Sequence, residues 1–105
     1  MQPFAAAISE LYSLEMWLSA DIGVAHPQHA PLRQLLQDLR IQLQQASRDP
    51  HGDAADATLA SRQLRSIKAL RSLLPDLEPR PVDLLDAVDR LDRISSHLMA
   101  AGGRP

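Results

Sequence analysis

Cysteine is absent from this 105-residue chain, and aromatic residues make up only 3% of it. The absence of cysteine excludes disulfide bonds, thiol catalysis and zinc sites built on cysteine. Aromatic side chains favour strands, whereas the Leu and Ala that dominate this sequence favour helices. No stretch reaches the roughly 18 uncharged apolar residues that a membrane-spanning helix needs. We therefore expect an all-helical protein without a membrane segment.

The small net charge and the low number of glycines also argue against several functions. The formal net charge is -2 at pH 7, so no strong field attracts nucleic acid or an anionic membrane. Only four glycines occur, and none has the spacing of a phosphate-binding loop. The first apolar run has no basic segment before it and is interrupted by Glu10 and Glu15, unlike a signal peptide. We expect a cytoplasmic protein.

Four helical segments are predicted between clusters of Pro, Gly and Asp. Proline suits the first turn of a helix, which favours starts near Pro3 and Pro31, and Pro75 ends the third segment. The segments cover residues 3–21, 31–47, 53–74 and 81–101. Helices of this length with short connections predict an all-α fold, an antiparallel up-down four-helix bundle. A single domain over residues 1–101 is expected, with a short disordered tail at 102–105.

The second segment shows the clearest apolar face, because its leucines follow the i, i+3, i+4, i+7 spacing of one helix stripe. Its opposite face is rich in glutamine. The residues predicted to form the core are Phe4, Ile8, Leu11, Leu18 and Ile22 in the first segment; Leu32, Leu35, Leu36, Leu39, Leu43 and Ala46 in the second; Leu59, Leu64, Ile67, Leu70, Leu73 and Leu74 in the third; and Leu84, Leu85, Val88, Leu91 and Leu98 in the fourth.

The first segment is apolar nearly all round. Leu14 and Trp17 extend its apolar arc to one side, and Tyr12 and Met16 extend it to the other. Three neighbouring helices cannot easily cover such a helix, so part of it is expected to meet a partner. Trp and Met are enriched at protein interfaces. We predict a protein interface at Tyr12, Leu14, Glu15, Met16 and Trp17, either with a second copy in a homodimer or with a different protein.

Glu15 lies inside the apolar stripe of this segment, between Leu11 and Leu18. A carboxylate in that position must be paired or lie at the edge of a contact. We favour a salt bridge to an arginine of another helix or of another copy. The alternatives are a metal-binding acid inside the bundle and an acid in a ligand groove.

The third segment carries four basic residues and no acid between residues 59 and 74. They are Arg62, Arg65, Lys68 and Arg71. The fourth segment is acidic, so the basic residues can form a solvated face beside it. They can also form a charged docking face for an acidic protein. A nucleic-acid contact is the least favoured interpretation, because no aromatic side chain is interleaved to stack on bases.

Two further patterns suggest other functions. His26 and His29 have a spacing that a metal or small ligand could use, and His51 is a candidate third ligand. Arg90 and His97 form an Arg-x6-His pattern. This pattern resembles the Arg-x4–6-His motif of HEPN-type ribonucleases, and the resemblance implies RNA cleavage by these two residues.

The sequence as a whole favours a non-enzymatic protein-binding module. Adaptors, secretion chaperones, antitoxins and immunity-type proteins belong to this class. The module is expected to act through the apolar edge of the first helix and to use no metal and no cofactor. The alternatives are a small HEPN-like ribonuclease using Arg90 and His97, or a bundle that binds a metal or small ligand at Glu15 or at His26 and His29.

Overall fold

Four α-helices account for most of the chain. The computed structural model describes residues 4–20, 29–49, 52–77 and 83–104, without the side chains of residues 19 and 20. The helices are α1 (Ala5–Ala20), α2 (Ala30–Arg48), α3 (Asp53–Leu73) and α4 (Leu84–Ala100), and a 3-10 turn, η2 (Leu74–Asp76), follows α3. The described residues contain no strand, so the all-α prediction is confirmed. Each predicted segment corresponds to one observed helix.

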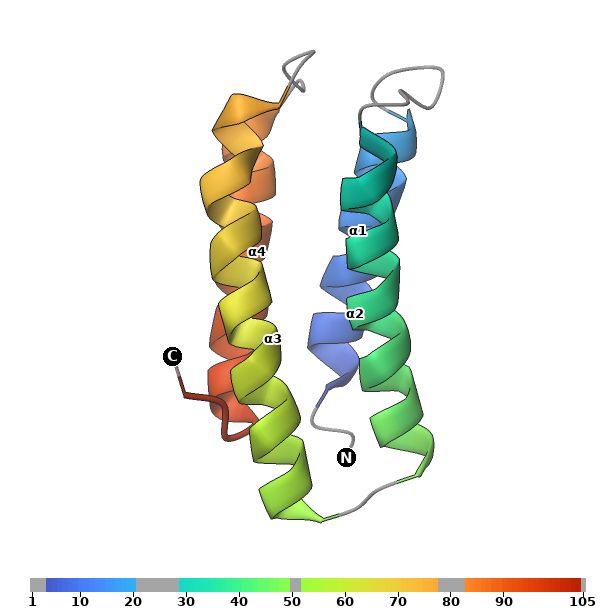
Figure 1. The fold of residues 1–105 in the computed structure, drawn as a ribbon, viewed down its shortest axis with the longest axis vertical. Coiled ribbons are helices and arrows are strands. Elements are labelled where there is room, and N and C mark those ends of the chain that lie inside the picture. Colours follow the sequence, from blue (N-terminus) through green and yellow to red (C-terminus); the bar gives the residue numbers. More distant parts are fainter. Residues whose placement is uncertain (1–3, 21–28, 50–51, 78–82, 105) are drawn as a thin grey trace.

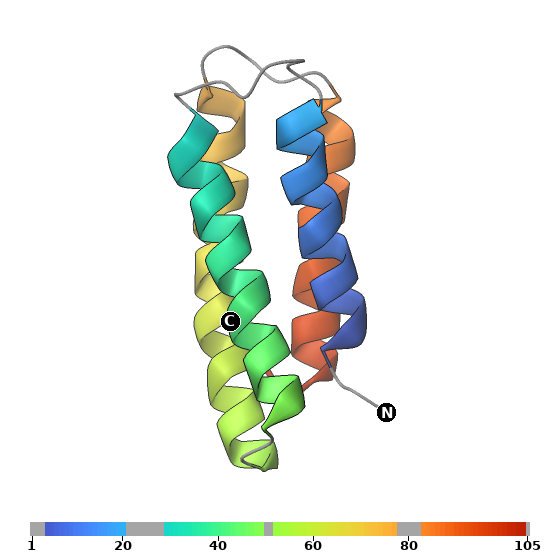
Figure 2. The ribbon, with the colours of Figure 1, turned by 90° about the vertical axis from the view of Figure 1, so that its right-hand side faces the viewer.

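Successive helices run in opposite directions and form a four-helix bundle (Figure 1, Figure 2). Contacts between α3 and α4 show this, because Ala57 lies beside Gly102 whereas Arg71, further along α3, binds Asp92, further back on α4. α1 packs against α2 on one side and α4 on the other, and α3 packs mainly against α4. The contact between α2 and α3 is the least extensive of the four.

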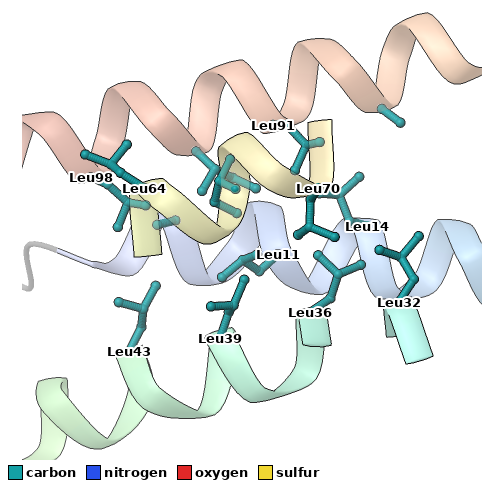
Figure 3. Close-up of a cluster of buried hydrophobic side chains, with 14 of the residues drawn as sticks. Leu11, Leu14, Leu32, Leu36, Leu39, Leu43, Leu64, Leu70, Leu91 and Leu98 are labelled. Carbon is teal, nitrogen blue, oxygen red and sulfur yellow. The ribbon is translucent and has the colours of Figure 1, made fainter. Parts of the chain in front are cut away.

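Leucines from all four helices fill the space between them (Figure 3). On α2 four of the six residues of the predicted stripe are buried, and the other two, Leu35 and Ala46, are partly buried against the core. Each such leucine contributes about 1.5–3 kcal/mol by leaving water. The buried apolar residues are Phe4, Ala7, Leu11, Leu14, Leu18, Leu32, Leu36, Leu39, Leu43, Ala60, Leu64, Ile67, Leu70, Leu74, Ala87, Leu91, Ile94 and Leu98.

Two residues predicted for the core lie on the surface instead. Leu73 of α3 is 55% exposed and Leu85 of α4 is 81% exposed. On each of these helices the apolar residues form an arc that is wider than the surface covered by the neighbouring helices. Leu73 and Leu85 lie at the edge of that arc. The prediction was wrong for these two positions because periodicity gives the centre of a buried face better than its edge. The predicted core residue Ile22 lies outside the described residues.

Glycine ends α4 in a Schellman motif. Gly102 has a φ of 98°, a conformation that glycine adopts at little cost. The backbone N–H of Gly102 donates to the carbonyl of Met99 at 3.0 Å, and that of Gly103 donates to the carbonyl of Leu98 at 2.9 Å. Gly103 is buried, so the described part of the predicted disordered tail, residues 102–104, lies against α3.

Candidate protein-binding surface

The five residues predicted as an interface divide into three environments. Leu14 is buried in the core, close to Leu70 and Leu91 (Figure 3). Trp17 is partly buried and packs against the core. Tyr12 and Met16 are 52% and 50% exposed, respectively. The part of the predicted interface that is open to solvent is therefore carried by Tyr12 and Met16, with Glu15 at its margin.

Tyr12 and Met16 belong to a line of exposed residues on the outward side of α1. Ala5, Ser9, Tyr12 and Met16 are all exposed and follow the spacing i, i+4, i+7, i+11. This spacing places them along one side of the helix over about 16 Å. We call these four residues the outer stripe. None of them carries a charge, so the outer stripe is a narrow uncharged surface with two large side chains at one end.

A closed ion pair borders the outer stripe on the side of α2. Arg40 of α2 hydrogen-bonds both carboxylate oxygens of Glu15, with Nη2 at 3.1 Å from Oε1. Each of the two side chains is only 17% exposed. The same guanidinium lies 5.4 Å from the centre of the Tyr12 ring. The hydrogen bond to Glu15 raises the pKa of Arg40, so this arginine stays charged and held against α1.

A second cluster of charges lies on the α4 side of α1, beyond Ala6 and Ser13 as seen from the outer stripe. Arg90 and Arg93 both bind the carboxylate of Glu10, at 3.4 Å and 3.2 Å. Arg90 also binds Asp86 at 3.0 Å, and this hydrogen bond raises the pKa of Arg90. The two acids of α1 are therefore both neutralised by arginines of the neighbouring helices. The favoured interpretation of Glu15, a salt bridge to another helix, agrees with this arrangement.

The residues of the predicted ribonuclease motif lie on the side of α4 that faces α1. The guanidinium of Arg90 is occupied by Asp86 and Glu10. His97 is partly buried and lies in the last turn of α4, about 10 Å further along the helix axis. In this arrangement Arg90 connects α4 to α1 through its contact with Glu10.

The four basic residues of α3 are spread around the helix and do not form one face. Arg71 binds Asp92 of α4 at 2.9 Å. Arg62 lies on the opposite side of α3, where it lines a groove with α2. Residues spaced by three rotate by about 60° per step around a helix, so the four span half its circumference. Arg65 and Lys68 lie between these extremes and point outward.

Of the three histidines predicted to bind a metal, the described residues include one. His29 is fully buried at the start of α2. His26 and His51 lie outside the described residues. Within the ranges that are described, no three His, Asp or Glu side chains are close enough to hold a metal ion.

One buried polar residue, Gln63 of α3, was missed by the sequence analysis. Its Nε2 donates to the backbone carbonyl of Leu39 at 2.9 Å and approaches Oε1 of Gln42 at 3.4 Å. Its own Oε1 has no hydrogen-bond partner among the described residues. Gln42 also lines an open groove of about 620 Å³ between α2 and α3, together with Gln45, Ala46, Arg48, Asp49, Leu59 and Arg62. Of the glutamine-rich face predicted on α2, Gln45 lines this groove.

None of the described helices is both long enough and apolar enough to cross a membrane. Comparison of the chain with protein-family models, with curated proteins and with solved structures found no match.

Proposed function

We propose that this protein is a non-enzymatic protein-binding module that acts through the outer stripe of α1. The proposal assigns it to the same functional class as adaptors, secretion chaperones, antitoxins and immunity-type proteins. It also assigns the protein to the cytoplasm. The partner covers Tyr12 and Met16, and the bundle holds these side chains in place. Binding then needs no rearrangement of the core.

The observation that carries the proposal is the pair of large, half-exposed side chains on an uncharged stripe. Tyr12 and Met16 lie one turn apart on the same side of α1. Tyrosine and methionine are enriched at protein interfaces, where a few central side chains supply most of the binding energy. The Arg40–Glu15 pair borders the stripe and is already closed. A partner therefore covers apolar surface without leaving a charge unpaired.

Other exposed apolar residues lack this arrangement. Leu73 lies on α3, and Leu85 and Met99 lie at opposite ends of α4. Single exposed apolar side chains are common on protein surfaces and need no function. The outer stripe differs because its exposed residues form a continuous uncharged line. The basic residues Arg62, Arg65, Lys68 and Arg71 lie on α3, which packs mainly against α4, so they are not part of this surface.

Site-specific photo-crosslinking tests the proposal in the cells that make the protein. Benzoylphenylalanine is placed at position 12 or 16, and also at position 85 as a matched exposed control. We expect discrete crosslinked products from positions 12 and 16 and none from position 85, because only the outer stripe is covered. Equal yields from all three positions, or no product from positions 12 and 16, would exclude the outer stripe as a binding surface.

A further inference from the structure

The outer stripe is divided by size along its length. Ala5 and Ser9 form its N-terminal half, and Tyr12 and Met16 form its C-terminal half. All four are exposed, so a helix laid along the stripe meets two small side chains and then two large ones. Helices pack by placing large side chains into spaces left by small ones. The surface that fits this stripe best has the same sizes in the reverse order.

A second copy of α1, running antiparallel, has this reverse order. When the pairing is centred between residues 10 and 11, Ala5 lies opposite Met16 of the second copy. In the same pairing Ser9 lies opposite Tyr12 of the second copy. Every small residue then faces a large one, and the two contacts repeat by two-fold symmetry. A parallel pairing instead places the two tyrosines together and the two alanines together, which leaves a clash at one end and a gap at the other.

The charges around the stripe allow two copies to approach. The cluster of Asp86, Arg90, Glu10 and Arg93 has two acids and two bases, so its formal charge is zero. The Arg40–Glu15 pair is neutral as well. Two identical surfaces repel each other when they carry net charge, and the paired charges beside α1 cancel. On the α2 side, Arg33 and Arg48 line grooves with Glu15 and Ala5, respectively, and add positive charge next to these pairs. A strongly charged partner would gain little here, because both acids of α1 already bind arginines of α2 and α4.

We infer that the partner of the outer stripe is a second copy of this chain, bound with the two α1 helices antiparallel and with Ala5 opposite Met16. This inference rests on the proposed function, since it assigns an occupant to the same surface. The contact covers about three helical turns, which is small for a protein interface, so we expect an association in the micromolar range.

Molar mass measured by sedimentation equilibrium tests the inference. The wild-type protein is examined from about 10 µM to about 1 mM, the range that brackets a micromolar dissociation constant. We expect the mass to rise from that of one chain, 11.6 kDa, towards twice that value. Leu85→Glu, at an exposed apolar position outside the stripe, should leave the curve unchanged. A wild-type protein that stays monomeric over the whole range overturns the inference.

Charge variants test the antiparallel register. Ala5→Glu and Met16→Lys should each weaken association at least about fivefold, because each alters both symmetric contacts. An equal mixture of the two should recover association, since one native contact is kept and the other brings the two introduced charges, of opposite sign, face to face. A mixture of Ala5→Glu with Ala5→Lys should not recover, because these positions lie far apart in the antiparallel pairing. Recovery in the second mixture instead of the first overturns the antiparallel arrangement.

The crosslinking experiment separates failure of this inference from failure of the proposed function. The protein can prove monomeric and still form a crosslinked product from position 12 whose mass differs from that of two chains. In that case a different protein binds to the stripe. A monomeric protein without any such product loses both proposals. Circular dichroism of each variant confirms that it is folded, which is expected because residues 5 and 16 are exposed.

Discussion

Arg40 of α2 holds the carboxylate of Glu15 of α1 with two hydrogen bonds, at a point where both side chains are 17% exposed. This pair connects the core to the outer stripe, because the same guanidinium lies against the ring of Tyr12. A carboxylate on an apolar helix is tolerated here since its partner comes from a neighbouring helix. The pair therefore fixes the position of α1 relative to α2 beside the candidate interface.

Removing one partner of the Arg40–Glu15 pair should lower the free energy of unfolding. Arg40→Met leaves a largely buried carboxylate without its partner, and we expect a loss of about 1–2 kcal/mol in urea unfolding. A double-mutant cycle with Glu15→Gln should give a coupling energy of similar size. The exposed Arg71–Asp92 pair is the matched control, where the coupling should stay below about 0.5 kcal/mol. Equal coupling in both pairs would contradict a special role for Glu15.

Replacing Gln63 by an apolar residue of similar volume should be tolerated. The Oε1 atom of Gln63 is buried without a hydrogen-bond partner among the described residues, which destabilises the folded state. Gln63→Met removes this atom and also the bond to the Leu39 carbonyl, so we expect a change within about 1 kcal/mol. Gln63→Ala should cost about 2–3 kcal/mol, because it leaves a cavity. Thermal unfolding of the two variants decides the point; a Met variant as unstable as the Ala variant would show that the amide is needed.

Gly103→Ala should destabilise the protein although residue 103 lies near the end of the chain. A Cβ atom at this position would come within 2.8 Å of the Leu98 carbonyl and 2.9 Å of the Ala60 Cβ. We expect a loss of about 1–3 kcal/mol in urea unfolding. Arg104→Ala is the control, since Arg104 contributes its backbone N–H to Ser61 and its side chain is replaceable. Equal stability of Gly103→Ala and the wild type would mean that this segment leaves α3 in solution.

RNA cleavage should be absent from the purified protein. The guanidinium of Arg90 is bound by Asp86 and Glu10, so it is not available to a phosphate. We expect single-stranded RNA to remain intact with the wild type and with His97→Ala. Cleavage by the wild type that disappears in His97→Ala would restore the ribonuclease interpretation.

The positions of the helices could be predicted from the sequence better than the side of each helix that faces the core. The leucines of α2 define a single face, and Leu32, Leu36, Leu39 and Leu43 are buried as expected. On α1 the apolar residues surround the helix, so the sequence could not tell which of them point to the core. The structure separates Leu14, which is buried, from Tyr12 and Met16, which are exposed. This distinction depends on where α2 and α4 lie.

For side-chain contacts between helices, the sequence could predict the type of the partner residue but not its position. The position of Glu15 in an apolar stripe predicts an arginine partner, and the structure supplies Arg40. The identity of that arginine depends on how α1 and α2 align, which no periodicity within one helix gives. Burial of Gln63 was missed for the same reason, because it follows from the contact of α3 with α2.

The relative oxidation of two methionines tests the central claim, that the outer stripe is covered in the working protein. Met16 and Met99 are 50% and 48% exposed in the single chain, so peroxide should oxidise them at similar rates if nothing covers either. Cells that make the protein are treated with hydrogen peroxide, and sulfoxide at each position is measured by mass spectrometry. Our account predicts that Met16 is oxidised at least about fivefold more slowly than Met99, and that the difference disappears after denaturation. Equal rates at Met16 and Met99 in the cell would contradict it.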